Sequence, residues 1–179
     1  MATATTMTPD LWNALTALQP RLRRFALGLS GSLDEADDLV QAAYERAIGR
    51  IEQWQAGTRL DSWMYRILQS IHLNRIQSRR VRGSHLQPVD PDTLRAPDNE
   101  RALVASMTLA KVRAFIDRLP EEQRAALLLV SVEGLSYREA ADTLNLPIGT
   151  LTSRIARAHR LARLRGRDGA ARRFRGDPS

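Results

Sequence analysis

Apolar residues recur every three or four positions along most of the chain, a spacing that places them on one face of an α-helix. The first such stretch runs from Pro9 to Leu29. Pro9 suits the first turn of a helix, and Gly31 suits the break after one. We therefore predict one helix here, with an inward face made of Leu11, Leu15, Leu18, Leu22, Phe25 and Leu29.

A second helix is predicted to begin after Ser32, because Ser32-Leu-Asp-Glu35 has the pattern of a capping box, in which Glu35 reaches back to the start of the helix. It should run to about Gln53. A loop follows, and a third helix is predicted from about Asp61 to Arg80. The residues expected to face inward are Leu39, Ala43, Ala47, Ile48 and Ile51 in the second helix and Trp63, Ile67 and Ile71 in the third, with Leu68 as an additional candidate.

The character of the chain changes at Gly83. Residues 83–99 contain three prolines among polar residues and show no usable period, which is typical of a linker. Helical period returns from Leu103 to Leu119. A further helix is predicted from Glu121 to Val132, and Gly134 should end it.

The most specific pattern comes next, as two short helices joined by a tight turn. Ser136 to Leu144 predicts the first helix, and Asn145-Leu-Pro147 predicts the turn. In the second helix, one face carries Leu151, Ile155, Ala158 and Ala162, and another carries Thr150, Ser153, Arg154 and Arg157. The polar face suits base edges and phosphates, since Arg can grip guanine with two hydrogen bonds. A helix-turn-helix that places its second helix in the major groove of DNA fits this pattern.

The expected fold is therefore all-α, with two small helical domains joined by a flexible linker and no visible strand pair or internal repeat. The first domain should span 9–82, the linker 83–99, and the domain that ends in the helix-turn-helix 100–164. Residues 165–179 should form a basic, disordered tail.

Positive charge is concentrated at the end of the chain. Residues 146–179 hold nine Arg against two Asp, which accounts for the whole net charge of +7, so residues 1–145 are balanced. Such a block is typical of a surface that binds a polyanion, and the binding would depend strongly on salt. For Arg165 to Arg175 a tail that only aids solubility is an equally open interpretation.

Composition excludes several classes of protein. The chain has no Cys, so it can form neither disulfides nor thiolate metal sites. No apolar run approaches the roughly 20 residues that span a membrane, and residues 1–8 lack the features of a secretory signal, so we expect a cytoplasmic location without membrane insertion. His72, His85 and His159 are scattered across different elements, and the clustered carboxylates lie in the opening turn of a helix without a nearby His or phosphate-binding glycine loop, so we expect neither a catalytic site nor a metal or cofactor. A two-metal nuclease would need carboxylates that converge in space, which sequence does not settle.

Two motifs stand in the first half of the chain: Asp34-Glu-Ala-Asp-Asp-Leu-Val-Gln41 with Ala43, Glu45 and Arg46, and Trp63-Met-Tyr-Arg-Ile67. Three more follow in the second half: Leu119-Pro-Glu-Glu-Gln-Arg-Ala125, Gly134-Leu-Ser-Tyr-Arg-Glu-Ala-Ala141 and Gly149-Thr-Leu-Thr-Ser-Arg154. In this order they resemble the motifs of the extracytoplasmic-function (ECF) sigma factors of bacterial RNA polymerase. The first resembles the helix that this family docks on the polymerase clamp, the second resembles the start of its promoter-melting helix, and the last three resemble its −35-reading domain. Pro20-Arg-Leu-Arg-Arg-Phe25 and Gly57-Thr58 resemble the general-stress subgroup of alphaproteobacteria. The resemblance covers about Leu11 to Arg163.

The resemblance implies three binding surfaces and three partners: core RNA polymerase, promoter DNA and an anti-sigma factor that holds the protein inactive. Candidate polymerase contacts are Asp34, Asp37, Asp38, Leu39, Gln41 and Glu45. Candidates for −10 recognition and melting are Arg59, Arg75, Arg79, Arg80 and Arg82. Candidates for −35 recognition are Arg138, Thr150, Thr152, Ser153, Arg154, Arg157 and Arg160, with Arg138 and Arg160 expected on phosphates.

The chain departs from the family pattern at two places. Leu68-Gln-Ser70 stands where the family usually has an Arg-Asn pair, and Thr152 stands where Lys or Arg is common. Two other functions stay open: a sigma mimic that titrates an anti-sigma factor, and a helix-turn-helix regulator that acts without polymerase docking. A mimic should have lost its basic DNA faces, yet the arginines remain. A simple regulator leaves the first domain without a purpose.

Overall fold

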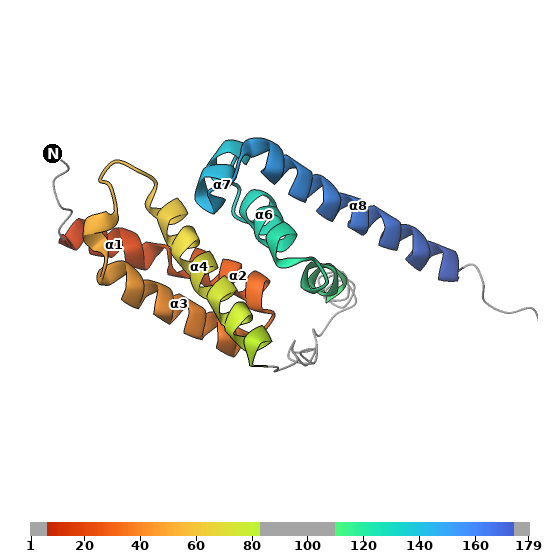
Figure 1. Ribbon diagram of the computed structural model, residues 1–179, viewed down its shortest axis with the longest axis horizontal. Helices are drawn as coiled ribbons and strands as arrows, with labels where there is room; N and C mark the ends of the chain where they lie inside the picture. The colour runs from red at the N-terminus through yellow and green to blue at the C-terminus, as the bar shows by residue number, and fades with distance from the viewer. Residues whose placement is uncertain (1–6, 83–109, 174–179) are drawn as a thin grey trace, which may run out of the picture.

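The computed structural model describes residues 7–82 and 110–173, with side chains up to residue 162, and every regular element within these ranges is a helix (Figure 1). The predicted linker, 83–99, lies outside them, as does the start of the helix predicted from Leu103, of which residues 110–117 are seen as helix. The elements are α1 (Pro9–Ala17), α2 (Gln19–Ser30), α3 (Leu33–Ile48), the 3-10 helix η1 (Ile51–Gln53), α4 (Leu60–Val81), α6 (Glu121–Ser131), α7 (Tyr137–Leu144) and α8 (Ile148–Arg173).

The stretch predicted as one helix from Pro9 to Leu29 is two helices, α1 and α2. The chain turns at Leu18, and Pro20 lies in the first turn of α2. A proline has no backbone N–H to donate and is disfavoured inside a helix but suits its first turn, so it favours a new start here. Gly31 ends α2 with a φ of +80°, as its place in the sequence predicted.

The core of the first half lies between α2, α3 and α4. Leu39, Ala43 and Ala47 are buried as predicted, whereas Ile48 is 44% exposed at the end of α3. In α4 the inward face is displaced from the predicted one, because Trp63 and Ile67 are only half-buried at its edge. The buried side chains of α4 are Asp61, Met64, Tyr65, Leu68, Ile71, His72 and Ile76.

The second half forms the predicted helix-turn-helix. The side chain of Ser136 accepts a bond from the backbone of Glu139 while Glu139 reaches back, so α7 begins with a complete capping box. Asn145 ends α7 with a φ of +53°, a conformation that Asn tolerates well. Leu151, Ile155 and Ala158 are buried, which confirms the inward face of α8. The helix continues to Arg173, so residues 165–173 are helical and the prediction of a disordered tail from 165 is wrong there.

The two halves pack against each other. Helix α6 lies against α2, and α7 lies against α4 (Figure 1). The two helices approach closely at Gly28 in α2, where an added Cβ would lie 2.7 Å from a methyl carbon of Leu128 in α6. Buried residues of both halves belong to one continuous core. The sequence predicted two tethered domains but gave no indication that they close on one another.

Candidate functional site

The first candidate surface is the outer side of α3. Its polar candidates project outward, and Gln41 donates a 3.0 Å hydrogen bond to Glu45 one turn later. Leu39 is 1% exposed and lies in the core, so it cannot contact a partner in this arrangement and is removed from the candidate surface. The exposed residues that remain are Asp34, Asp37, Asp38, Gln41 and Glu45, which we call the acidic surface.

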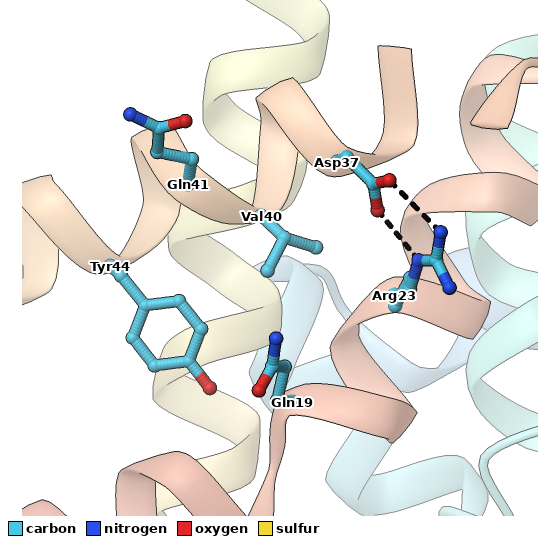
Figure 2. Close-up of a pocket in the computed structure, with 6 residues that line it drawn as sticks. All are labelled: Gln19, Arg23, Asp37, Val40, Gln41 and Tyr44. Atoms are coloured by element: carbon cyan, nitrogen blue, oxygen red, sulfur yellow. Dashed lines mark hydrogen bonds and ion pairs between the residues drawn. The ribbon is translucent and has the colours of Figure 1, made fainter. Parts of the chain in front are cut away.

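A pocket of about 340 Å³ borders the acidic surface between α2 and α3. Figure 2 shows Arg23 and Asp37 joined at one end, with Tyr44 at the other. The guanidinium donates bonds of 2.6 and 2.9 Å to the carboxylate, and they hold the pKa of Asp37 below its ordinary value. The hydroxyl of Tyr44 donates to the carbonyl of Leu15 at 2.7 Å, and burial raises the pKa of that hydroxyl. The pocket therefore has one charged and one largely neutral end.

The second candidate surface is a groove of about 540 Å³ between α3 and α4. Arg75, Arg79 and Arg82 line it together, as their spacing predicted, and Arg80 is exposed but does not line it. The Glu35 carboxylate lies 3.0 Å from the Arg79 guanidinium. It therefore pairs with an arginine of this groove instead of reaching back to the start of α3, as the predicted capping box required. We call this feature the arginine groove, lined by Ala42, Arg46, Ile71, Asn74, Arg75, Ser78, Arg79 and Arg82.

Arg59 lies apart from the arginine groove, at the contact between the two halves. It donates to the Asp61 carboxylate at 2.6 and 3.0 Å, and it also binds Glu139 of α7. These contacts raise the pKa of Arg59 and lower that of Asp61, although burial of Asp61 opposes the second shift. The structure therefore does not bring Arg59 together with the other −10 candidates.

The third candidate surface is the outward face of the helix-turn-helix. Arg138, Thr150, Ser153, Arg157 and Arg160 are exposed. Arg154 is engaged instead, since its guanidinium lies 2.7 Å from the carboxylate of Glu122 in α6. Thr152 is exposed as well, but its hydroxyl donates back to the carbonyl of Ile148 at 2.9 Å, as Thr often does inside helices.

One cluster that the sequence did not predict joins the halves. The side chain of Glu133, just after α6, is fully buried and accepts bonds from Tyr65 at 2.6 Å and from Arg24 at 2.9 Å. Arg21 adds a contact at 3.3 Å. Burial, followed by the hydrogen bond to Glu133, raises the pKa of Tyr65. The three partners lie 68 to 112 residues before Glu133 in the chain, so no local spacing in the sequence reveals the cluster.

Further contacts cross the same boundary. Arg124 in α6 donates to the carbonyl of Leu29 at 2.6 Å, and His72 in α4 lies 2.9 Å from Glu121. Arg66 donates to backbone carbonyls at the end of α7 at 2.7 and 3.2 Å. Charged side chains of one half are thus bonded to the other half along the length of the contact, which we call the interdomain contact.

Within residues 7–82 and 110–173, no helix is both long and apolar enough to cross a membrane. In the same residues, three or more His, Asp or Glu side chains nowhere gather in a way that could hold a metal ion.

Each half of the chain matches a known protein family. Residues 15–69 match the family described as the sigma2 domain of PhyR, and residues 109–160 match the family described as Sigma-70, region 4. The second match contains α6, α7 and the part of α8 that carries the candidate −35 contacts. The first contains α2, α3 and the start of α4.

Individual relatives agree with these matches. The ECF RNA polymerase sigma factor EcfG of Rhodopseudomonas palustris is 35% identical over 165 residues, which cover 92% of this chain and 90% of EcfG. The ECF sigma factor SigE of Mycolicibacterium smegmatis is 37% identical over 146 residues, which cover 80% of this chain and 56% of SigE. The sigma factor RpoE of Bartonella quintana, solved with the anti-sigma factor NepR, superposes with a TM-score of 0.70 at 27% identity, over 86% of this chain and 94% of RpoE. The chain therefore belongs to the extracytoplasmic-function sigma factors of bacterial RNA polymerase, within the general-stress type.

Proposed function

We propose that this chain binds core RNA polymerase through the acidic surface and directs promoter-specific initiation through its two arginine-bearing surfaces. The observation that carries the proposal is the presence of all three surfaces on one chain, each on its own helices. Sigma factors perform no covalent chemistry, and we assign this chain a binding role in the cytoplasm rather than a catalytic one.

The acidic surface is the proposed docking site for polymerase. Its carboxylates project from one side of α3, where the Arg23–Asp37 pair fixes one of them. The adjoining pocket adds apolar and hydrogen-bonding groups from Val40 and Tyr44. A charged rim beside a partly apolar depression is typical of a specific protein interface.

The two DNA surfaces have different proposed tasks. The arginine groove would hold the melted strand near −10, since single strands are bound by basic grooves. Arg59 and Arg80 are assigned to the same region outside the groove. On the helix-turn-helix, Ser153, Arg154 and Arg157 would face bases, and Arg138 and Arg160 would bind phosphates and set the register.

The interdomain contact has to open for this function. The two promoter elements are centred roughly 25 base pairs apart, or about 85 Å at the rise of B-DNA. The 27 residues between Arg82 and Ala110 could span at most roughly 100 Å if extended. The chain therefore has the reach to hold both elements only when the halves separate, which would also free Arg59 from Glu139.

An anti-sigma factor is the proposed negative regulator. The solved structure of RpoE contains its anti-sigma factor NepR, and RpoE matches this chain over both halves. We propose that a protein of that class binds this chain and favours its closed arrangement. A ligand shifts such an equilibrium only as far as its affinities for the two states differ.

A sigma mimic is the second candidate function, favoured by the match of residues 15–69 to the sigma2 domain of PhyR. A PhyR solved with NepR is described as an anti-anti-sigma factor, although at 20% identity it supports only the fold. The retained arginines weigh against this candidate, because a mimic has no need to bind DNA.

Reconstituted transcription separates the candidates. The purified chain is mixed with core RNA polymerase and a genomic promoter library, and start sites are mapped. A sigma factor should bind core and produce starts at a shared pair of −35 and −10 sequences. Binding to an anti-sigma factor without binding to core would establish the mimic instead, and binding to promoter DNA without core would establish the simple regulator.

A further inference from the structure

Helix α3 presents different residues to the two depressions that flank it. Asp37, Val40, Gln41 and Tyr44 line the pocket toward α2. Ala42 and Arg46, one helical turn apart, line the arginine groove toward α4. Arg46 therefore belongs by position to the same surface as the arginines of α4, although its helix carries the proposed polymerase contacts.

The charges in the groove are strongly unbalanced. Four arginines line it, and Glu35 is the carboxylate that reaches them, through Arg79. Arg75 donates a 3.3 Å bond to the backbone carbonyl of Asp38. This carbonyl is neutral, so it does not balance the positive charge of Arg75. Arg46 is half-buried at the groove wall, so part of its motion is already restricted. Such a surface attracts an anion with more than one negative charge.

The other lining residues indicate which part of a nucleic acid would lie there. Asn74 and Ser78 are exposed hydrogen-bonding groups, and Ala42 and Ile71 are small or aliphatic. No lining residue is aromatic. Bases held in single-stranded sites stack on aromatic rings, whereas Arg, Ser and Asn contact phosphates and sugars. The groove therefore fits the backbone of a strand rather than its bases.

We infer that Arg46 is a DNA-phosphate contact, so that the surface that holds the melted strand extends from α4 onto α3. The inference rests on the proposed function of the groove and adds a residue from the helix assigned to polymerase. A phosphate contact stabilises every sequence equally, so Arg46 contributes affinity and salt dependence without contributing to the choice of −10 bases.

The test compares Arg46→Ala with Arg50→Ala, a matched control that removes an exposed arginine from just beyond the end of α3 and outside the groove. Holoenzyme made with each variant is titrated with promoter DNA carrying a pre-opened −10 region, at several salt concentrations, with matched and scrambled −10 sequences. Arg46→Ala should weaken binding about three- to tenfold on both sequences and reduce the salt slope by roughly 0.7, while Arg50→Ala changes neither. Arg46→Lys should recover most of the loss, since a phosphate accepts either cation.

Three results would overturn the inference. One is equal affinity of the Arg46→Ala and Arg50→Ala holoenzymes. Another is weaker binding of Arg46→Ala to core polymerase, measured without DNA, which would make Arg46 a docking residue. The third is a loss confined to the matched −10 sequence, which would make it a base contact.

Arg75→Ala separates failure of the inference from failure of the proposed function. If Arg75→Ala weakens DNA binding and Arg46→Ala does not, the groove binds DNA through α4 alone and the Arg46 assignment falls. If neither variant has an effect, the assignment of the whole groove to DNA falls with it. Thermal unfolding followed by circular dichroism checks that each variant remains folded.

Discussion

Tyr65 in α4 donates a 2.6 Å hydrogen bond to the carboxylate of Glu133, which lies 68 residues later in the other half of the protein. The Glu133 side chain has no exposed surface, and its remaining contacts come from the half-exposed arginines of α2. A buried carboxylate is costly without such partners. Packing of the two halves against each other therefore supplies the hydrogen-bond partners that the buried Glu133 needs, and these bonds in turn stabilise the packed arrangement.

Neutralising Glu133 should open the protein. In Glu133→Gln the shape is kept but the charge that binds Arg21 and Arg24 is lost, which costs about 1–3 kcal/mol for bonds of this kind. The chain has no Cys, so Glu52→Cys and His159→Cys can carry a dye pair, one on each half. Energy transfer between the dyes should fall in Glu133→Gln relative to the parent.

The control is Asp37→Asn, which breaks the exposed Arg23–Asp37 pair within the first half. This variant also removes one carboxylate charge, but it leaves the interdomain contact intact, so energy transfer between the dyes should stay unchanged. Equal transfer in the parent and Glu133→Gln would show that packing of α2 on α6 holds the halves together without the buried carboxylate.

Gly28 offers a second way to open the interdomain contact. A Cβ at this position would lie 2.7 and 2.8 Å from the two methyl carbons of Leu128, so in Gly28→Ala either the buried Leu128 side chain or one of the two helices has to shift. Ala is also a better helix former than Gly by up to about 1 kcal/mol, so α2 itself should not suffer. We expect lower energy transfer, with no loss of helical circular dichroism.

A double variant tests the mechanism of the Gly28 effect. Leu128→Ala removes the methyl groups that the new Cβ would meet. Gly28→Ala combined with Leu128→Ala should therefore cost less than the sum of the two single changes, as neighbouring sites usually couple by about 0.5–3 kcal/mol. Additive costs would place the strain somewhere other than between these residues.

The polymerase-docking proposal predicts a loss of affinity for core enzyme when the acidic surface is altered. Asp38→Ala combined with Gln41→Ala removes two exposed groups of α3 and leaves the Arg23–Asp37 pair in place. A loss of about 1–2 kcal/mol is expected for contacts of this class. Asp10→Ala in α1 is the control, and equal binding of both proteins to core would refute the docking assignment.

Arg157 and Arg154 should behave differently on −35 DNA. Arg157→Ala should cost about 1–3 kcal/mol, with the greater loss on the preferred promoter, because Arg157 is exposed and assigned to bases. Arg154 must first leave Glu122, so Glu122→Gln should strengthen binding modestly, since that pair is exposed on the Glu122 side. A loss for Arg157→Ala that is equal on promoter and random DNA would make Arg157 a phosphate contact.

The sequence predicted the parts of this protein that depend on neighbouring residues. The capping box at Ser136, the turn at Asn145 and the inward face of α8 all arise within one or two helical turns, and each is confirmed. The common face of Arg75, Arg79 and Arg82 follows from helical spacing for the same reason. Local pattern and resemblance together were enough to identify the family.

Several omissions come from contacts between distant residues. The buried face of α4 includes Tyr65, which packs edge-on against Phe25 of α2 and donates to Glu133 in the other half, and periodicity within α4 cannot express either contact. At Leu39 the helical spacing and the resemblance gave conflicting predictions, and its burial confirms the inward face that the spacing predicted and excludes the docking role that the resemblance implied. The break between α1 and α2 was local and could have been found, because Pro20 was available as a signal.

Acid should weaken the protein through Asp61. Hydrogen bonds from Arg59 lower the pKa of this carboxyl in the folded state, and burial raises it by less. An unfolded chain has a pKa near 3.9 at this position, so it takes up a proton at a higher pH than the folded protein does. The stabilisation is therefore complete above about pH 5 and is lost as the pH falls below about 4, through the lowered folded value.

Urea unfolding at pH 5 and pH 3 measures the difference in stability, which should be smaller in Asp61→Asn because that variant has no proton to bind at this site. If Asp61→Asn loses as much stability between these pH values as the parent does, the Arg59–Asp61 pair is not the source of the acid sensitivity, and Glu139, whose pKa is also lowered, is the next carboxylate to neutralise.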